Sequence, residues 1–311
     1  MFLSPQQVLR YGLEFHKVKT HRWSQKSKVT EFHKLYGSSP LDLADQWYDL
    51  CYGEYLDNKI ALQEKEKNEK GFRRFMMTHY WMWEYPKNAR IFSKDSGICE
   101  RYCRGKPHWI WLKRIGALKV KKIVWPKNKP DEFIPFSVDG VDFIINEEPH
   151  PTLERDPGGM SHKIKHYAAK YEVVLATQQS KCIHIAGPFK GAVHDLTMFR
   201  RSGLKEKLQK WNAKVGDNIR HVCLCLADRG YITSQNDEDV FAIPNGHDEP
   251  ETASFKSRGR LRHETFNARL KFFSCLRCQW HHGFKKHGLA FEAVCVTVQY
   301  QMDNGSPIFS A

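Results

Sequence analysis

The sequence predicts an α/β protein in which a mixed sheet with flanking helices follows a mainly helical N-terminal region. One observation is a change of character near residue 130. Before it, apolar and aromatic residues recur at helical spacing, and after it short β-branched runs alternate with polar turns. The other is the order of elements after that point: three strands, a helix, a strand, a loop and a helix.

This change of character divides the 311 residues into three predicted parts, within the size range of one large or two medium domains. Residues 1–118 form the helical region, 119–130 a basic linker and 131–311 the α/β domain. The linker is assigned because five lysines stand beside two prolines, namely Lys119, Lys121, Lys122, Lys127 and Lys129 with Pro126 and Pro130.

Composition limits the function classes. With 41% hydrophobic and 27% charged residues, the chain is neither disordered nor collagen-like. Its net charge of +14 predicts a polyanionic partner, with nucleic acid as the leading candidate and an acidic membrane surface as the alternative. No apolar run is long enough to span a bilayer, and no secretory signal is visible at the start. An odd number of cysteines, 9, predicts reduced thiols inside the cell.

Two short helices are expected near the N-terminus. Val29, Phe32 and Tyr36 are at helical spacing, Gly37 ends that helix, and Ser39-Pro40-Leu41-Asp42 is typical of a new helix start. The pair resembles a helix-turn-helix, in which the second helix enters the major groove of DNA. The alternative is an ordinary helical hairpin.

The α/β part has the order of elements found in the catalytic core of RNase H-like nucleases. A helix beginning near Asp195 is expected to bend at Ser202-Gly203, and an apolar strand ends at Asp228. The expected strands are residues 133–145, 170–177, 181–188 and 221–227, and the last helix covers 261–275.

Three acidic residues in this part are candidates for metal-dependent phosphodiester chemistry, because two divalent ions need several carboxylates that converge on one point. Asp139 interrupts the first strand, with a hairpin turn at Asp139-Gly140 as its alternative role. Asp228 ends the apolar strand, where it could equally open a turn. Glu264 lies in the last helix on one stripe with Arg260 and Lys271, which could also be a solvated basic face.

Several motifs in order carry a family resemblance over roughly residues 133–311. The chain resembles the DDE superfamily endonuclease domain of PIF/Harbinger-type transposases in Gly187-Pro188-Phe189-Lys190-Gly191-Ala192-Val193-His194-Asp195, Leu226-Ala227-Asp228-Arg229-Gly230-Tyr231, Arg262-His263-Glu264-Thr265-Phe266-Asn267 and the tail from Phe291 to Pro307.

The resemblance implies an RNase H-like fold and a catalytic, metal-binding triad of Asp139, Asp228 and Glu264. It implies a transposase or endonuclease that cleaves and joins DNA with two Mg²⁺ ions, or Mn²⁺ in their place. One ion would lower the pKa of the attacking water or 3′-hydroxyl, and the other would stabilise the leaving oxygen. The implied partners are double-stranded transposon ends and a separate DNA-binding protein, and the implied location is the nucleus. The oligomeric state stays open, with a homodimer as one option.

Two features of this sequence limit how far the family's catalytic residues can be assigned to it. Many relatives continue the first aspartate as Gly-Thr-His, whereas this chain has Gly140-Val141-Asp142. Asp195 competes with Asp228 as second metal ligand, although its position at a helix start also suits a cap. Topology favours Asp228, because the fourth strand of this fold lies beside the first.

Basic residues surround the candidate glutamate. Between Ala253 and His287 there are nine Lys or Arg residues and one acid, an imbalance that predicts contact with DNA phosphates. The candidate DNA-binding residues are Arg260, Arg262, Arg269 and Lys271. Cys275 and Cys278, followed by His281-His282, have zinc-ligand types at tighter than usual spacing, and the alternative is one buried and one exposed thiol.

Three functions remain open from the sequence. The first is a metal-dependent transposase nuclease. The second is a domesticated, transposase-derived protein that binds DNA or a protein without cutting. The third is a basic DNA-binding factor, whose binding would depend on salt and not on metal.

Overall fold

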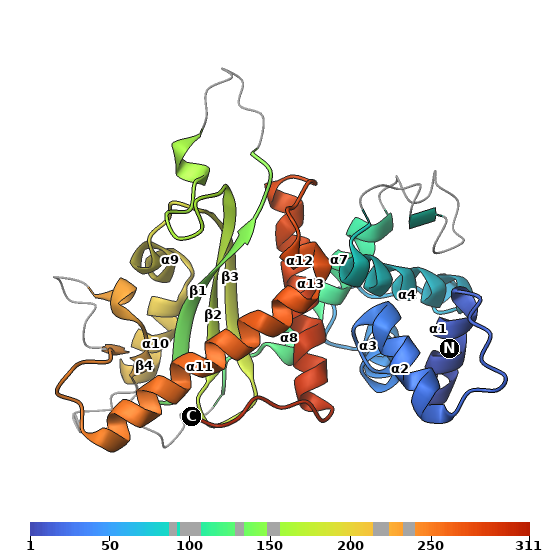
Figure 1. The fold of residues 1–311 in the computed structure, drawn as a ribbon, viewed down its shortest axis with the longest axis horizontal. Helices are drawn as coiled ribbons and strands as arrows, with labels where there is room; N and C mark the ends of the chain where they lie inside the picture. Colours follow the sequence, from blue (N-terminus) through green and yellow to red (C-terminus); the bar gives the residue numbers. More distant parts are fainter. Residues whose placement is uncertain (87–91, 94–106, 128–133, 148–155, 214–223, 233–239) are drawn as a thin grey trace. The chain divides into compact units, whose positions relative to one another are not determined.

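The computed structural model describes residues 1–86, 92–93, 107–127, 134–147, 156–213, 224–232 and 240–311 (Figure 1). These residues form two compact units. Unit 1 contains Met1–Lys122, Arg269–Trp280 and Lys285–Ser306, and unit 2 contains Ile123–Ala268, His281–Phe284 and Pro307–Ala311. None of the described helices has the length and apolar character needed to cross a membrane.

Unit 1 is built from helices. They are α1 (Pro5–Phe15), α2 (Gln25–Tyr36), α3 (Pro40–Tyr52), the 3₁₀ turn η1 (Glu64–Glu66), α4 (Glu69–Glu84), α7 (Pro107–Ala117), α8 (Lys119–Lys122), α12 (Ser274–Arg277) and most of α13 (Phe284–Asp303). The predicted stop and start between α2 and α3 are confirmed. Gly37 has a left-handed φ of 64°, and a Cβ there would lie 1.9 Å from Trp83 Cε3. Ser39 caps α3 in a reciprocal pair with Asp42.

Helix α3 does not have the surface of a DNA-reading helix. It contains no Lys or Arg, and most of its residues are buried, with Leu41, Tyr48 and Tyr52 exposed. A recognition helix must present polar and basic groups to base edges and phosphates. Helix α3 packs on α1, and α2 packs on α4 and α1. The composition and burial of α3 therefore do not support a DNA-reading role for this helix.

The division into units differs from the predicted boundary between residues 118 and 131. Helix α8 belongs to unit 1, where Lys121 pairs with Asp49 at 2.5 Å and Lys122 with Asp303 at 2.8 Å. Lys121 and Lys122 are therefore ion-paired residues of unit 1. Of the rest of the predicted linker, residues 123–127 belong to unit 2 and residues 128–130 lie outside the described ones. Helix α13 was predicted to be part of the α/β domain, but it belongs to unit 1 because its apolar residues are buried there.

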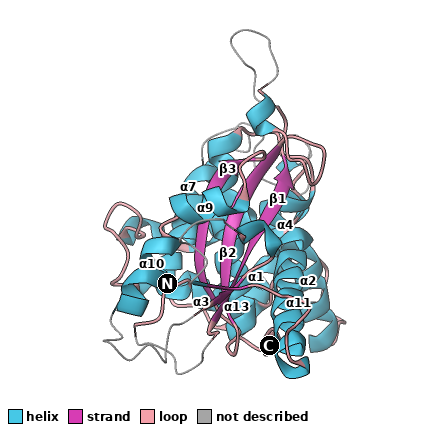
Figure 2. Cartoon of the chain, turned by 90° about the vertical axis from the view of Figure 1, so that its left-hand side faces the viewer, coloured by secondary structure: helices cyan, strands magenta, loops and turns pink. Residues whose placement is uncertain are grey.

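Unit 2 contains a five-stranded mixed sheet in the order β3-β2-β1-β4-β5. The strands are β1 (Phe136–Ile144), β2 (Ala168–Ala176), β3 (Cys182–Lys190), β4 (Cys225–Leu226) and β5 (Phe241–Ala242). Figure 2 shows the three long strands side by side. Strand β1 is antiparallel to β2 and parallel to β4, with Ser137 opposite Leu226. The RNase H-like α/β fold is confirmed, and so is the expected place of the fourth strand beside the first. The predicted strand 221–227 begins in residues outside the described ones.

Helices cover both faces of this sheet. Helices α9 (Asp195–Arg201) and α10 (Leu204–Ala213) bury one face, where Val138 packs with Phe199 and Leu208. The break between them falls at Gly203, as predicted, with a φ of 78°. The alternate residues of β1 point to the other face. There Ser137 hydrogen-bonds His263 of α11 (Pro250–Phe272), a helix that starts earlier than the sequence predicted.

Candidate active site

Asp139 lies in the middle of β1, on the face that meets α11. Its Oδ2 accepts a hydrogen bond from Asn267 Nδ2 at 3.3 Å, and the side chain is partly buried. Burial raises the pKa of Asp139 to about 6. Lys163 opposes this rise, while the negative charges of Asp228 and Asp195 add to it. Asp139 is therefore within electrostatic reach of both competing second ligands.

Asp228 follows the last residues of β4 and lies near Asp139 because β4 runs parallel to β1. Its side chain also accepts a hydrogen bond from Gly230 N at 2.8 Å and so caps the short 3₁₀ turn η4 (Arg229–Tyr231). The turn role that the sequence offered as an alternative is present. It uses one carboxylate oxygen and leaves the other for a further partner.

Asp195 is the first residue of α9 and is not its cap. The cap is His194, whose Nδ1 accepts a hydrogen bond from Leu196 N at 3.4 Å. Asp195 Oδ1 instead lies 2.8 Å from Lys170 Nζ. The capping explanation for Asp195 is thus removed, and the structure brings both Asp195 and Asp228 towards Asp139.

Two glycines leave the space in which these carboxylates approach. A Cβ on Gly140 would lie 2.6 Å from Asp195 Oδ1. A Cβ on Gly230 would lie 2.8 Å from Asp195 Oδ2 and 2.9 Å from Asp228 Oδ1. Because real side chains do not approach so closely, any residue other than glycine at these positions would push the carboxylates away.

The position of Glu264 relative to the aspartates follows only from its place on α11. Helix α11 is attached to β1 by His263 on Ser137, at 2.9 Å, and by Asn267 on Asp139. Glu264 lies one helical turn before Asn267, with its side chain exposed. It is on the same helix and sheet face as the Asp139 contact, but no described contact joins it to the aspartates.

Carboxylate oxygens are the donors that Mg²⁺ and Mn²⁺ prefer. Asp195 Oδ1 is buried, and beside its ion pair with Lys170 it accepts no hydrogen bond of good geometry. The carboxylate chemistry and the unsatisfied Asp195 Oδ1 both suit a divalent ion. Within the described part of the chain, however, no three His, Cys, Asp or Glu side chains lie close enough together to hold one. In this structure, therefore, the carboxylates of Asp139, Asp195 and Asp228 do not form a closed ligand set.

The candidate DNA-binding residues separate into two kinds. Arg260 and Lys271 are exposed. Arg262 is buried, and its Nη2 donates to Ala176 O at 2.7 Å and Gln179 O at 2.6 Å. Arg269 is partly buried and donates to the Ser306 carbonyl. The prediction for Arg262 is corrected: its guanidinium holds α11 to the end of β2 and cannot reach DNA phosphates.

The cysteine pair shows the arrangement expected of ordinary thiols. Cys275 is buried and Cys278 is exposed. Burial raises the pKa of the Cys275 thiol, which opposes the thiolate that zinc requires.

Sequence reasoning missed three polar residues around the aspartates. They are Asn267, Lys170 and Glu172, which is fully buried on β2 beside Gly140. Asn267 could have been found from its spacing, three residues after Glu264 on one helix face. The residues around Lys170 and Glu172 predict a strand, and nothing in their pattern indicates a functional role.

One protein family matches the sequence of this chain. Residues 138–299, just over half of the chain, match the DDE superfamily endonuclease family. The chain belongs to the DDE superfamily endonucleases. No curated protein and no solved structure matches it.

Membership of the DDE superfamily endonucleases makes this a transposase-like nuclease in general terms, with DNA as the substrate class. The matched segment begins one residue before Asp139 and includes Asp195, Asp228 and Glu264. The match names the superfamily and does not distinguish the PIF/Harbinger type.

Proposed function

We propose that this DDE endonuclease cleaves and joins DNA phosphodiesters with divalent cations held by Asp139, Asp228 and Glu264, and that Asp195 is a further ligand. One observation carries the proposal: Asp195 and Asp228 both lie beside Gly230, and both are within electrostatic reach of Asp139 on the neighbouring strand. Mutual repulsion makes such an arrangement costly unless a cation compensates it.

Each residue has a part that its position supports. Asn267 Nδ2 donates to Asp139 Oδ2 and Gly140 N donates to Asp139 Oδ1 at 2.9 Å, so both carboxylate oxygens of Asp139 have a fixed position. The Asp228 oxygen that does not cap η4 is available as a ligand. Glu264 would complete the set from α11. A bound Mg²⁺ or Mn²⁺, and in the full proposal two ions, would supply the Lewis acidity for in-line displacement at phosphorus.

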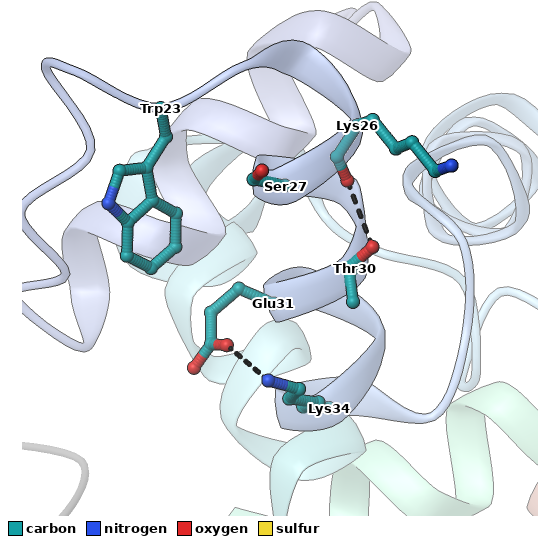
Figure 3. A pocket seen from close by; sticks show the side chains of 6 residues that line it. All are labelled: Trp23, Lys26, Ser27, Thr30, Glu31 and Lys34. Carbon is teal, nitrogen blue, oxygen red and sulfur yellow. Dashed lines mark hydrogen bonds and ion pairs between the residues drawn. The ribbon is translucent and has the colours of Figure 1, made fainter.

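DNA contact outside the acidic site is proposed for the exposed face of α2 in place of α3. A shallow pocket of about 390 Å³ on this face is lined by Trp23, Lys26, Ser27, Thr30, Glu31 and Lys34 (Figure 3). Glu31 pairs with Lys34 at 3.1 Å, and Lys26 is exposed. Lysine side chains of this kind suit phosphate contacts, and an indole that is 39% exposed suits stacking on a sugar or base.

The test is a set of isosteric substitutions with a matched control. Asp139→Asn, Asp195→Asn, Asp228→Asn and Glu264→Gln are each expected to abolish Mn²⁺-dependent nicking of a supercoiled plasmid while DNA binding persists. Glu251→Gln, which removes an exposed carboxylate in the first turn of α11, is the control and should nick normally.

The readouts separate the competing functions. Nicking that survives Asp139→Asn would remove the acidic site from the mechanism. A wild-type protein that binds DNA but neither binds Mn²⁺ nor nicks would instead be the non-cutting, transposase-derived binder.

A further inference from the structure

The ammonium group of Lys170 occupies the acidic site from the strand side. Lys170 is on β2, where its backbone is opposite Asp142 of β1. Its Nζ lies 2.8 Å from Asp195 Oδ1 and donates to Val193 O at 3.1 Å, and its side chain is only 14% exposed. Its Cε lies 3.3 Å from the point where a Cβ on Gly140 would be. Lys170 thus fills the space between Gly140 and the first turn of α9.

Packing alone gives no reason for a lysine here. Moving an ammonium into a protein interior costs free energy that an apolar side chain of similar length would not cost. The positive charge of Lys170 has a role because acidic groups surround it. Asp195 adds to the raised pKa of both Asp139 and Glu172, which shows that negative charge accumulates around Asp195. A fixed positive charge lowers that repulsion when no metal ion is bound.

The same contact puts Lys170 in competition with a metal ion. Asp195 Oδ1, the oxygen nearest Lys170 Nζ, faces the space left by Gly140. An ammonium at 2.8 Å and a divalent cation at about 2.1 Å cannot both take that oxygen without displacement of one of them. The ion pair also holds Asp195 in a position in which the aspartates do not yet form a closed ligand set.

We infer that Lys170 is a positioning residue that holds Asp195 in the metal-free protein and must release Asp195 Oδ1 to the incoming divalent cation. This inference rests on the proposed metal-dependent function. Lys170 then competes with the metal ion for Asp195 Oδ1. This competition raises the concentration of divalent cation at which the site becomes occupied.

The experiment measures Mn²⁺ binding to the full-length protein by isothermal titration calorimetry. Lys170→Met removes the ammonium and keeps most of the side-chain volume, so the Kd for Mn²⁺ should fall at least about tenfold. Lys170→Arg keeps the charge and should stay near the wild-type Kd. Lys190→Met is the matched control, because Lys190 pairs with Asp156 at 2.8 Å on the exposed surface of the same unit; its Kd should not change.

A double-mutant cycle with Asp195→Asn shows whether the effect passes through that carboxylate. If it does, adding Lys170→Met to Asp195→Asn should change the Kd much less than it changes that of the wild type. The metal-free Lys170→Met protein should also have a lower Tm than the wild type, with a larger rise on addition of Mn²⁺.

The outcomes distinguish the two proposals. If the wild type binds Mn²⁺, Asp139→Asn abolishes binding and Lys170→Met leaves the Kd unchanged or higher, the role of Lys170 is wrong and the metal site stands. If the wild type does not bind Mn²⁺ at these aspartates, both proposals are overturned.

Discussion

Gly140 shows how closely the acidic site depends on one residue. A methyl group there would lie 2.6 Å from Asp195 Oδ1 and 3.1 Å from Met198 Cε, both at the ends of side chains that can shift. Gly140→Ala should therefore cost little stability, about 1 kcal/mol, but raise the Kd for Mn²⁺ roughly tenfold or more because Asp195 is displaced.

Calorimetry and thermal unfolding of the same samples check this prediction. Gly246→Ala is the control, since nothing lies within 4 Å of a Cβ at that position. Equal Mn²⁺ affinity in both variants would show that Gly140 is not needed for the position of Asp195.

Glu172 makes a pH-dependent contribution to stability. Burial raises its pKa to about 7, the Ser202 hydroxyl and Lys207 oppose this rise and Asp195 adds to it. Because the folded protein holds this proton up to a higher pH than the unfolded chain, whose glutamate has a pKa near 4.5, the folded state loses stability as pH rises from about 4.5 through 7.

Glu172→Gln removes this titration and should change stability little at pH 4, below the pKa of the unfolded chain. At pH 8 the variant should be more stable than the wild type by roughly 2 kcal/mol, because no buried carboxylate must ionise. Urea unfolding of metal-free protein at several pH values measures the difference. A stability difference that does not vary with pH would contradict the prediction.

At the scale of elements, α11 combines a buried anchor with an exposed basic side. Arg262 donates to two backbone carbonyls from a buried position, and burial lowers the pKa of its guanidinium to about 10. Arg262→Met leaves those carbonyls without their donor and should lower the free energy of unfolding by roughly 3 kcal/mol. Arg260→Met, on the exposed side, should leave stability unchanged and weaken DNA binding.

Urea unfolding and DNA titrations across salt concentrations separate the two arginines. If Arg262→Met unfolds like the wild type but binds DNA more weakly, the corrected role of Arg262 is wrong.

The exposed face of α2 can be tested in the same way. Lys26→Ala combined with Lys34→Ala should reduce the slope of log K against log salt by about one for each phosphate that the protein no longer touches. The control combines Lys59→Ala with Lys65→Ala, two exposed lysines outside α2 in the same unit. An equal reduction in both pairs would indicate general charge attraction and no role for α2.

At the scale of the whole molecule, the units are not continuous in sequence. Helix α13 follows the sheet in the chain, yet it belongs to unit 1. There Gln301 donates to Gly37 O at 2.7 Å, Thr297 hydrogen-bonds Gln46 at 3.5 Å, and Val294, Val296 and Val298 are buried.

A fragment of residues 131–311 should consequently not fold as an independent domain. Without the N-terminal helices it exposes the apolar residues of α13, so we expect strong binding of a hydrophobic dye and no cooperative thermal transition. The full-length protein is the reference. A fragment that unfolds cooperatively near the full-length Tm would show that α13 does not need unit 1.

The sequence by itself determined the local features of this protein: the succession of three strands, a helix and a fourth strand along the chain, the break at Gly203, the cap at Ser39 and the three carboxylates as candidates. Each depends on residues close together in the chain, where spacing and turn chemistry act directly. The sequence did not predict β5, which falls in the stretch expected to be a loop.

Only the tertiary structure decided that Asp195 joins Asp228 within electrostatic reach of Asp139, that Arg262 is buried and that Lys170 reaches Asp195. It also decided that α13 belongs with the N-terminal helices. These facts depend on which distant segments pack against each other. The local pattern of a strand or helix does not depend on the segment that it packs against. The run around Lys170 and the apolar helix α13 therefore do not reveal their partners in the sequence.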